Sequence, residues 1–410
     1  MMSVPDSFPD IEAALLSVQS DVARVPLLLA LSRKLAHRDE RRAFSLAEEA
    51  YQLQLRLNRQ MPEALSALAQ ALNLMSLCLY RLSDYHASLQ RAEDAIAFAA
   101  EANDELQLAE AQMNLGRVMW SFGSYETSLK AYGEALSLFH RNGNADGTAQ
   151  AFNNIGTVYR SQGNYDDAIA AYEKGLKIWE LMNDEIGVAQ VLNNLGNIYN
   201  ETGKYNDALD VYHRSLDLFK KHGDLVSEAG LMHNIGNIYA HLGDYAKALE
   251  YYEAELQLSR THHLAQGESF ALDGIGQIYF KMGDYVSARS FFEQGLSIAE
   301  QMGDKVSIAE SLINIASAHQ VLGELDDAKH TFERSLHLFR EVGHQFGEGL
   351  ALHGLGSTYR HLGDAQSAHH FLNESLTLRQ KLGDRRGMCE DYLAIGKFYQ
   401  TFPDFRPVAD

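Results

Sequence analysis

The sequence predicts an all-α protein, an α-solenoid of antiparallel helix pairs, and three observations support this. First, phrases similar to NNLGNIYNETGKY recur nine times at intervals of 40 residues, among them 113–125, 153–165, 193–205, 233–245 and 273–285. Second, apolar residues recur at spacings of three and four, with no period-two alternation that would favour strands. Third, proline is absent between Pro62 and Pro403. Repeats of this length bury their apolar faces only by stacking on one another.

Each 40-residue unit is predicted to hold two amphipathic helices of about 14–17 residues joined by a short turn. In the unit 185–224 the stripe of the first helix is Val188, Val191, Leu192, Leu195, Ile198 and Tyr199, and that of the second is Tyr205, Ala208, Leu209, Tyr212, Leu216 and Phe219. A glycine recurs between the helices, usually followed by Asp, Asn or Ser, and another recurs between units. Glycine can close a helix in the left-handed conformation, and Asp or Asn can cap the next.

The units need no gaps over residues 65–384, which makes eight. Residues 1–64 are predicted to form a capping helix and a degenerate first repeat, with helices over 8–19, 26–35 and 41–57. Residues 385–410 look like a last, incomplete repeat in which Arg385–Gln400 is the first helix. Either Phe402–Asp410 folds back as a cap, or the chain continues, and an uncapped end could support self-association.

The composition narrows the class of partner and the compartment. A formal charge of -20 disfavours nonspecific binding to nucleic acid or anionic membranes. No apolar run is long enough to cross a bilayer, and the start lacks the pattern of a secretory signal. Cys78 and Cys389 are expected to be buried thiols of a cytoplasmic protein, too far apart in the array for a disulfide.

Small residues mark positions where helices must approach closely. A Leu-Gly or Ile-Gly pair recurs in seven first helices, for example Leu195-Gly196, and a tyrosine usually follows three residues after the glycine. The second helix carries an alanine and, four residues later, an aromatic residue. A glycine inside a helix costs about 1 kcal/mol relative to alanine, so a neighbouring helix is expected to come very close at these positions.

This pattern of small and large residues resembles the tetratricopeptide repeat (TPR), which implies a right-handed TPR superhelix. The resemblance covers about 320 residues, although the family's usual unit has 34 residues and often a proline near its end. The 40-residue unit with Asn-Leu-Gly-Asn is most similar to two groups, the Leu-Gly-Asn-repeat polarity adaptors and the TPR regions of bacterial signalling proteins. Both groups imply binding of a peptide or protein, without catalysis by the repeats.

The resemblance places one face of the first helices on the inner, concave wall, where a partner would bind. The predicted contact residues are Asn114, Arg117, Trp120, Asn153, Asn154, Arg160, Gln190, Asn193, Asn194, Asn197, Asn200, His233, Asn234, Asn237, Asp273, Gln277, Asn314, His353 and Arg360. A carboxamide both donates and accepts, so a ladder of them can satisfy the backbone of an extended segment. The alternative is that these amides bond to one another and stitch adjacent repeats together.

The sequence offers no recognisable cofactor, metal or catalytic motif. HExxH and CxxC spacings are absent, adjacent histidines on a helix point apart, and the glycines of 142–147 follow no strand. We therefore expect no enzyme and no cofactor, but a scaffold that binds a peptide or protein segment in its concave groove. The alternative function is a sensory or regulatory TPR region of a bacterial signalling protein, controlling an output domain or partner.

Overall fold

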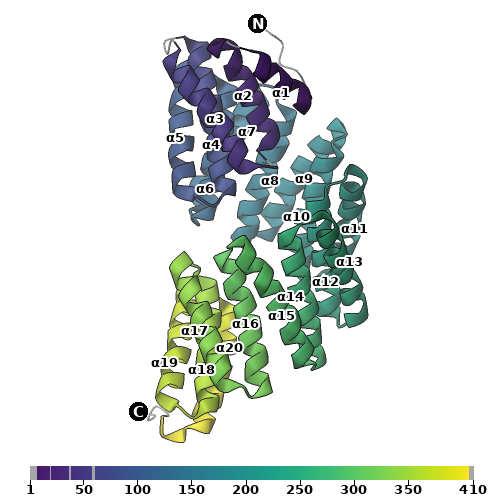
Figure 1. Ribbon diagram of the computed structural model, residues 1–410, viewed down its shortest axis with the longest axis vertical. Coiled ribbons are helices and arrows are strands. Elements are labelled where there is room, and N and C mark those ends of the chain that lie inside the picture. Colours follow the sequence, from purple (N-terminus) through teal and green to yellow (C-terminus); the bar gives the residue numbers. More distant parts are fainter. Residues whose placement is uncertain (1–6, 19, 37, 58–60, 406–410) are drawn as a thin grey trace. The chain divides into compact units, whose positions relative to one another are not determined.

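A computed structural model describes residues 7–18, 20–36, 38–57 and 61–405 (Figure 1). These residues form α-helices and one short 3₁₀ helix, with no strand among them, so the predicted all-α class is confirmed. The first ten helices are α1 (Phe8–Ser17), α2 (Asp21–Leu35), α3 (Glu40–Arg56), α4 (Pro62–Arg81), α5 (Tyr85–Ala102), α6 (Glu105–Ser121), α7 (Tyr125–Arg141), α8 (Ala145–Ser161), α9 (Tyr165–Met182) and α10 (Glu185–Glu201).

The helices continue in the same alternation along the second half of the chain. They are α11 (Tyr205–His222), α12 (Leu225–Leu242), α13 (Tyr245–His262), α14 (Ala265–Met282), α15 (Tyr285–Met302), α16 (Lys305–Leu322), α17 (Leu325–Val342), α18 (Gln345–Leu362), α19 (Ala365–Leu382), α20 (Arg385–Thr401) and the 3₁₀ helix η1 (Pro403–Phe405). Two compact units divide the chain, Met1–Val211 and Tyr212–Asp410. Within each, a helix packs on its chain neighbours, and even-numbered helices also contact the next even-numbered helix.

The turns follow the predicted chemistry and make the helices longer than expected. Gly243 ends α12 with a φ of 78°, and the Asp244 side chain accepts a hydrogen bond from the Lys247 N–H at 3.2 Å to start α13. Two residues thus separate the helices. Because the link is this short, α12 to α19 reach 18 residues each, beyond the predicted upper bound of 17.

The first helices differ in detail from the prediction. α2 begins at Asp21, five residues before the predicted start, and contains Pro26 in its interior. Proline removes one N–H from the helix ladder. Burial of Val25, Leu27 and Leu28, on either side of Pro26, offsets the loss of that hydrogen bond. The predicted end of the first helix, Gln19, lies outside the described residues.

The glycines of the first helices lie where a neighbouring helix comes very close, as predicted, and most of them are sockets for an aromatic ring. A Cβ on Gly156 would lie 2.6 Å from Cε1 of Tyr172, and one on Gly236 would lie 2.6 Å from Cε1 of Tyr252. Both tyrosines come from the second helix of the same pair and are buried. The missing side chain therefore lets the two helices of a pair pack closely through one ring.

At the C-terminal end of the described residues, η1 packs on α20. Phe405 in η1 packs edge-on against Phe398, which is fully buried against α19. The rest of the predicted cap, 406–410, lies outside the described residues. Cys78 is buried as expected, but Cys389 on α20 is exposed, which contradicts the prediction of two buried thiols. No helix among the described residues is long and apolar enough to span a membrane.

Candidate functional site

The candidate site is the face that the even-numbered helices of each unit share, here called the inner wall. Its residues fall into columns with a period of 40, and the first column contains Glu110, Gln150, Gln190, Phe270 and Glu310. The other columns begin at Met113, Asn114 and Arg117 and repeat at the same interval. Because the columns come from helices that contact one another, their residues lie side by side within each compact unit.

In the first unit the inner wall encloses a cavity of about 500 Å³, here called cavity A. Helices α2, α4, α6, α8 and α10 all contribute to its lining. Five predicted contact residues line it, namely Asn114, Arg117, Asn153, Asn154 and Gln190. The structure therefore brings together predicted residues that are up to 76 positions apart in the sequence (114 to 190).

Charges in cavity A are partly paired across the wall. Arg33 on α2 lies 3.4 Å from the Glu110 carboxylate on α6, although the two are 77 positions apart. Burial raises the pKa of Glu110, while the charges of Arg33 and Arg117 oppose that rise. Arg117 itself donates to Oδ1 of Asn114 at 2.6 Å. No hydrogen bond is recorded for the side chains of Asn154 or Gln190 in the described part of the chain, so both amides can bind a ligand.

In the second unit a cavity of about 540 Å³, here called cavity B, lies against α12, α14 and α16. It is lined by five more predicted residues, His233, Asn237, Asp273, Gln277 and Asn314. Three of their amides are bonded within the wall, since Gln277 donates to Asn314 at 2.8 Å and Asn237 accepts from the Tyr252 hydroxyl at 2.6 Å. His233 pairs through Nδ1 with the buried Glu255 at 3.1 Å.

Carboxylates in and beside cavity B are poorly solvated. Burial raises the pKa of Asp273 to about 7, with Ser311 and His233 opposing and Glu310 reinforcing the rise. Its Oδ1 is buried and has no hydrogen-bond partner in the described structure. Burial also raises the pKa values of Glu255 and Glu310. At the opposite edge, burial lowers the pKa of His241, and the charges of Lys281 and Arg386 lower it further.

The side chains of several predicted contact residues form hydrogen bonds to other helices of the protein. Asn114 is only 4% exposed and donates to the backbone oxygen of Asn73 at 2.9 Å, which stitches α6 to α4. Asn194 likewise donates to Oδ1 of Asn153 at 2.8 Å. Trp120 packs on the core of α6 and α7, and its Nε1 donates to Ser161 at 2.8 Å. The alternative role, joining repeats, thus applies to part of the amide ladder.

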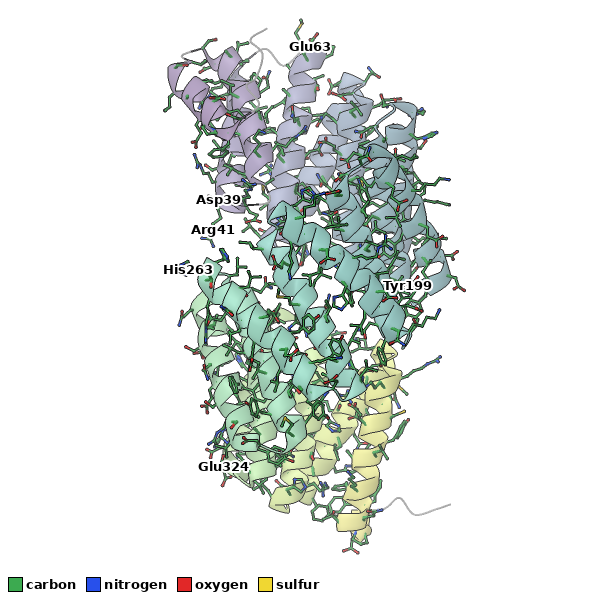
Figure 2. The ribbon with its side chains drawn as sticks, turned by 90° about the vertical axis from the view of Figure 1, so that its right-hand side faces the viewer. Asp39, Arg41, Glu63, Tyr199, His263 and Glu324 are labelled. Carbon is green, nitrogen blue, oxygen red and sulfur yellow. The ribbon has the colours of Figure 1, made fainter. Side chains whose placement is uncertain are left out.

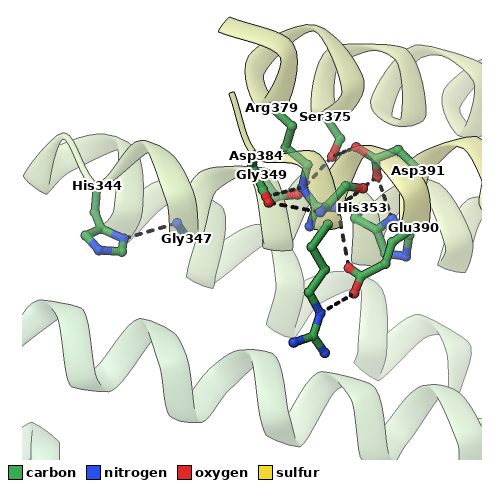
Figure 3. A network of polar contacts seen from close by, with 11 residues as sticks. His344, Gly347, Gly349, His353, Ser375, Arg379, Asp384, Glu390 and Asp391 are labelled. Atoms are coloured by element: carbon green, nitrogen blue, oxygen red, sulfur yellow. Dashed lines mark hydrogen bonds and ion pairs between the residues drawn. The ribbon is translucent and has the colours of Figure 1, made fainter. Parts of the chain in front are cut away.

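The remaining predicted residues do not line cavity A or B. Arg160 pairs with Glu201 at 3.4 Å, Arg360 lies 2.7 Å from the ring of His361, and His353 pairs with the buried Asp391 at 2.7 Å. His353 therefore belongs to a polar network between α18, α19 and α20 (Figure 3). Four amides are half-buried on α10 and α12 outside both linings, namely Asn193, Asn197, Asn200 and Asn234.

Sequence reasoning missed some residues that line the cavities. Glu110, Gln150, Phe270 and Glu310 share the 40-residue column of Gln190, so the period itself could have identified them. Arg33 and Trp179 carried no such signal. Arg33 comes from the degenerate first repeat, and Trp179 reaches cavity A from a second helix, where its Nε1 donates to Asp146 at 3.0 Å.

One group of side chains has the composition of a metal site, at the turn where Glu324 precedes α17 (Figure 2). The ligand atoms of His319, Glu324 and Asp327 all lie within 4.8 Å of one another. His319 binds Glu324 at 2.5 Å, and Arg289 also donates to that carboxylate at 2.7 Å. The Arg289 guanidinium thus already compensates the charge of Glu324.

Comparison with protein families identifies one that extends along most of the array. The sequence profile described as Tetratricopeptide repeat matches residues 107–181, 147–221, 227–301 and 307–381. A profile described as Anaphase-promoting complex subunit 5 matches residues 57–115. No curated protein matches the chain.

Several solved structures share the fold. A signal-transduction ATPase with a tetratricopeptide repeat sensor from Pyrococcus horikoshii is 15% identical, with a TM-score of 0.62 over 92% of this chain and 56% of that one. The Rap protein complexed with Competence and Sporulation Factor is 16% identical, with a TM-score of 0.60 over 88% and 99%. The Rap conjugation gene regulator of plasmid pLS20 with the Phr* peptide is 17% identical, with a TM-score of 0.55 over 90% and 98%.

Proposed function

Because the chain belongs to the tetratricopeptide repeat family, we propose that it is a protein-interaction scaffold that binds a peptide or protein segment along its inner wall. The observation that carries this proposal is the lining of cavity A. Five successive first helices converge there, and the amides of Asn154 and Gln190 face it without a recorded partner among the described residues. Each amide can both donate to and accept from a peptide backbone.

The chemistry of the wall favours binding over a reaction. Arg33 pairs with Glu110 and His233 contacts Glu255, and neither contact positions a nucleophile beside a base. We accordingly infer a role without catalysis. Two of the structures with this fold were solved with Competence and Sporulation Factor and with the Phr* peptide, respectively. These complexes support a peptide or protein segment as the ligand of this chain.

A test of this function needs a peptide of defined sequence. Peptides selected from a displayed random library on the full chain would be labelled, and their dissociation constants measured by fluorescence anisotropy. Replacing both Asn154 and Gln190 with Ala should weaken binding roughly tenfold or more, because two net hydrogen bonds of about 0.5–1.5 kcal/mol each are lost. A control variant, Gln90→Ala, removes an exposed amide from the second helix α5 and should bind as the original chain does.

The result can also reject the proposal. If the double variant keeps the original affinity for every selected peptide, the ligand lies elsewhere. If circular dichroism shows that the double variant has lost helical content, the binding test is repeated with the single variants Asn154→Ala and Gln190→Ala. Neither side chain has a recorded bond to break among the described residues, so unfolding of both single variants would contradict the geometry of cavity A.

A second function, regulation of an output domain, is supported by one comparison. The ATPase from Pyrococcus horikoshii has a tetratricopeptide repeat sensor by its description, and this chain covers 92% of its own length but 56% of that protein. A region of this kind would bind a peptide or protein segment at the inner wall, and the binding would change the activity of the output domain. Sequencing the gene beyond codon 410 decides between the two functions, since an output domain there favours the regulator.

A further inference from the structure

Cavity B differs from cavity A in which of its polar groups are available to a ligand. Its three amides, Asn237, Gln277 and Asn314, are already bonded within the wall. Two charged side chains of its lining, Glu310 on α16 and Lys281 on α14, have no recorded hydrogen bond or ion pair among the described residues. Cavity B therefore offers charges where cavity A offers amides.

One end of cavity B is acidic and aromatic. Glu310 occupies on α16 the position that Phe270 has on α14, and these two helices contact each other. The Phe270 side chain is 37% exposed and lines the cavity beside Asp273, whose buried Oδ1 has no partner in the described structure. Carboxylates and an aromatic ring both attract an ammonium or guanidinium group.

The other end of cavity B is basic. Lys281 is exposed near the end of α14, and His241 holds the same position on α12. Burial and the charges of Lys281 and Arg386 lower the pKa of His241, so the charged groups that act on this ring are cations. An anionic group is therefore the ligand that this end attracts.

The two ends are too far apart to neutralise each other. Asp273 and Lys281 are separated by about 12 Å along the axis of α14, and the level of Phe270 and Glu310 is about 16 Å from Lys281, at about 1.5 Å per residue. No ion pair joins Glu310 to Lys281 in the described part of the chain. A bound segment can pair with both charges at once, and charge-assisted hydrogen bonds are roughly twice as strong as neutral ones.

We propose that cavity B selects a segment with one basic and one acidic side chain, the basic group at Glu310 and the acidic group at Lys281. This inference rests on the proposed function and specifies the class of segment that is bound. An extended chain advances about 3.3 Å per residue, and side chains four residues apart point to the same face. Charges at that spacing, about 13 Å apart, match the separation of the two ends.

Displayed peptides with Lys and Glu fixed four residues apart test this selection on the full chain. Both orders of the two charges are used, because a segment can enter in either direction. Selected peptides should bind tenfold or more tightly than the same peptides with Gln at both fixed positions, as measured by fluorescence anisotropy. Lys281→Gln or Glu310→Gln should remove this difference. The controls Lys220→Gln and Glu253→Gln, at exposed charges of the second helices α11 and α13, should preserve it.

Charge exchange tests the basic end by itself. Lys281→Glu should bind a selected peptide tenfold or more weakly than the original chain, because two carboxylates then face each other. Replacing the peptide's Glu with Lys should restore binding to this variant and weaken binding to the original chain. If the exchanged peptide gains nothing with the variant, or if charged peptides bind no better than their Gln counterparts, the proposal is overturned.

The same peptides separate this proposal from the proposed function. The double variant Asn154→Ala with Gln190→Ala changes no residue that lines cavity B. If it weakens binding while the changes at Lys281 and Glu310 have no effect, the proposed function stands and the charge selection is wrong. If only the changes at Lys281 and Glu310 weaken binding, cavity B is the binding site and the assignment to cavity A is wrong.

Discussion

Arg379 Nη1 lies 3.3 Å from Oδ1 of Asp391, and both side chains are almost fully buried between α19 and α20 (Figure 3). In other pairs the position of Arg379 holds an aromatic residue, such as Phe139, Trp179 or Phe339, packed on a glycine of the next helix. Arg379 packs on Gly387 in the same way and donates to its carbonyl at 2.7 Å. The contact between α19 and α20 thus has a polar network where α7, α9 and α17 each place a ring on the next helix.

Removing one member of this network should destabilise the second unit. Arg379→Ala leaves the Asp391 carboxylate buried with only Ser375 and His353 as partners, at 2.8 and 2.7 Å. Breaking a buried ion pair from one side typically costs about 3–5 kcal/mol. Thermal unfolding followed by circular dichroism should show a lower midpoint.

Replacing both members together should cost less. Arg379→Phe with Asp391→Ala copies the Phe339–Ala351 arrangement found one pair earlier, and well-packed apolar residues often substitute for a buried ion pair without loss. We expect the double variant to melt above Arg379→Ala. If the double variant is less stable than Arg379→Ala, the polar network stabilises this helix pair more than apolar packing at the same positions does.

Two glycines of one pair should respond oppositely to alanine. Gly116→Ala would place a Cβ 2.5 Å from Cε1 of Tyr132 and force α6 and α7 apart, which costs about 1–3 kcal/mol. Gly133→Ala on α7 meets nothing within 4 Å and should stabilise the helix by up to about 1 kcal/mol. Urea unfolding measures the change in the free energy of unfolding for each variant. Equal changes would contradict the packing of Tyr132 on Gly116.

The contribution of Asp273 to the stability of the protein should fall as pH rises between about 4 and 7. Burial raises the pKa of Asp273 from 3.8 to about 7, so in this range the folded carboxyl keeps a proton that the unfolded one releases. Asp273→Asn should reduce this slope in urea unfolding at successive pH values. The slope should not vanish, because burial also raises the pKa values of Glu110, Glu255 and Glu310.

An exposed aspartate provides the control for that measurement. Hydrogen bonds from Ser287 lower the pKa of Asp284, so its stabilising effect is lost only as pH falls below the usual range of a carboxyl. Asp284→Asn should therefore leave the slope between about pH 4 and 7 unchanged. A slope that is the same in the original chain and in Asp273→Asn would mean that Asp273 is ionised throughout this range.

The two roles of the amide ladder can be separated by stability. Asn114→Ala removes a buried hydrogen bond to the Asn73 backbone and should cost about 1 kcal/mol of unfolding free energy. Asn154→Ala removes no bond recorded in the described structure and should leave stability nearly unchanged. If both variants are equally destabilised in urea, Asn154 also joins repeats and cavity A loses one of its two free amides.

The sequence by itself determined the helix pairs, their turns and the inner wall. A period of 40 residues repeats the same local physics many times, so the glycine sockets of Gly156 and Gly236, and the cap at Asp244, were predictable from spacing alone. The columns also identified ten residues that line the two cavities. Local pattern suffices for these features because each pair packs mainly on its neighbours.

Only the tertiary structure decided which amides are engaged and which are free. Asn114 and Asn154 occupy the same column and both line cavity A, yet only Asn114 is bonded to the preceding repeat among the described residues. The choice depends on which groups lie within reach, namely the Asn73 carbonyl on α4 and the Arg117 guanidinium on the same helix α6, and the repeat pattern does not constrain these distances. Only the tertiary structure shows the pairing of Arg379 with Asp391 as well. Both side chains are buried and lie 3.3 Å apart, and the spacing of the two residues in the sequence does not predict that they are buried.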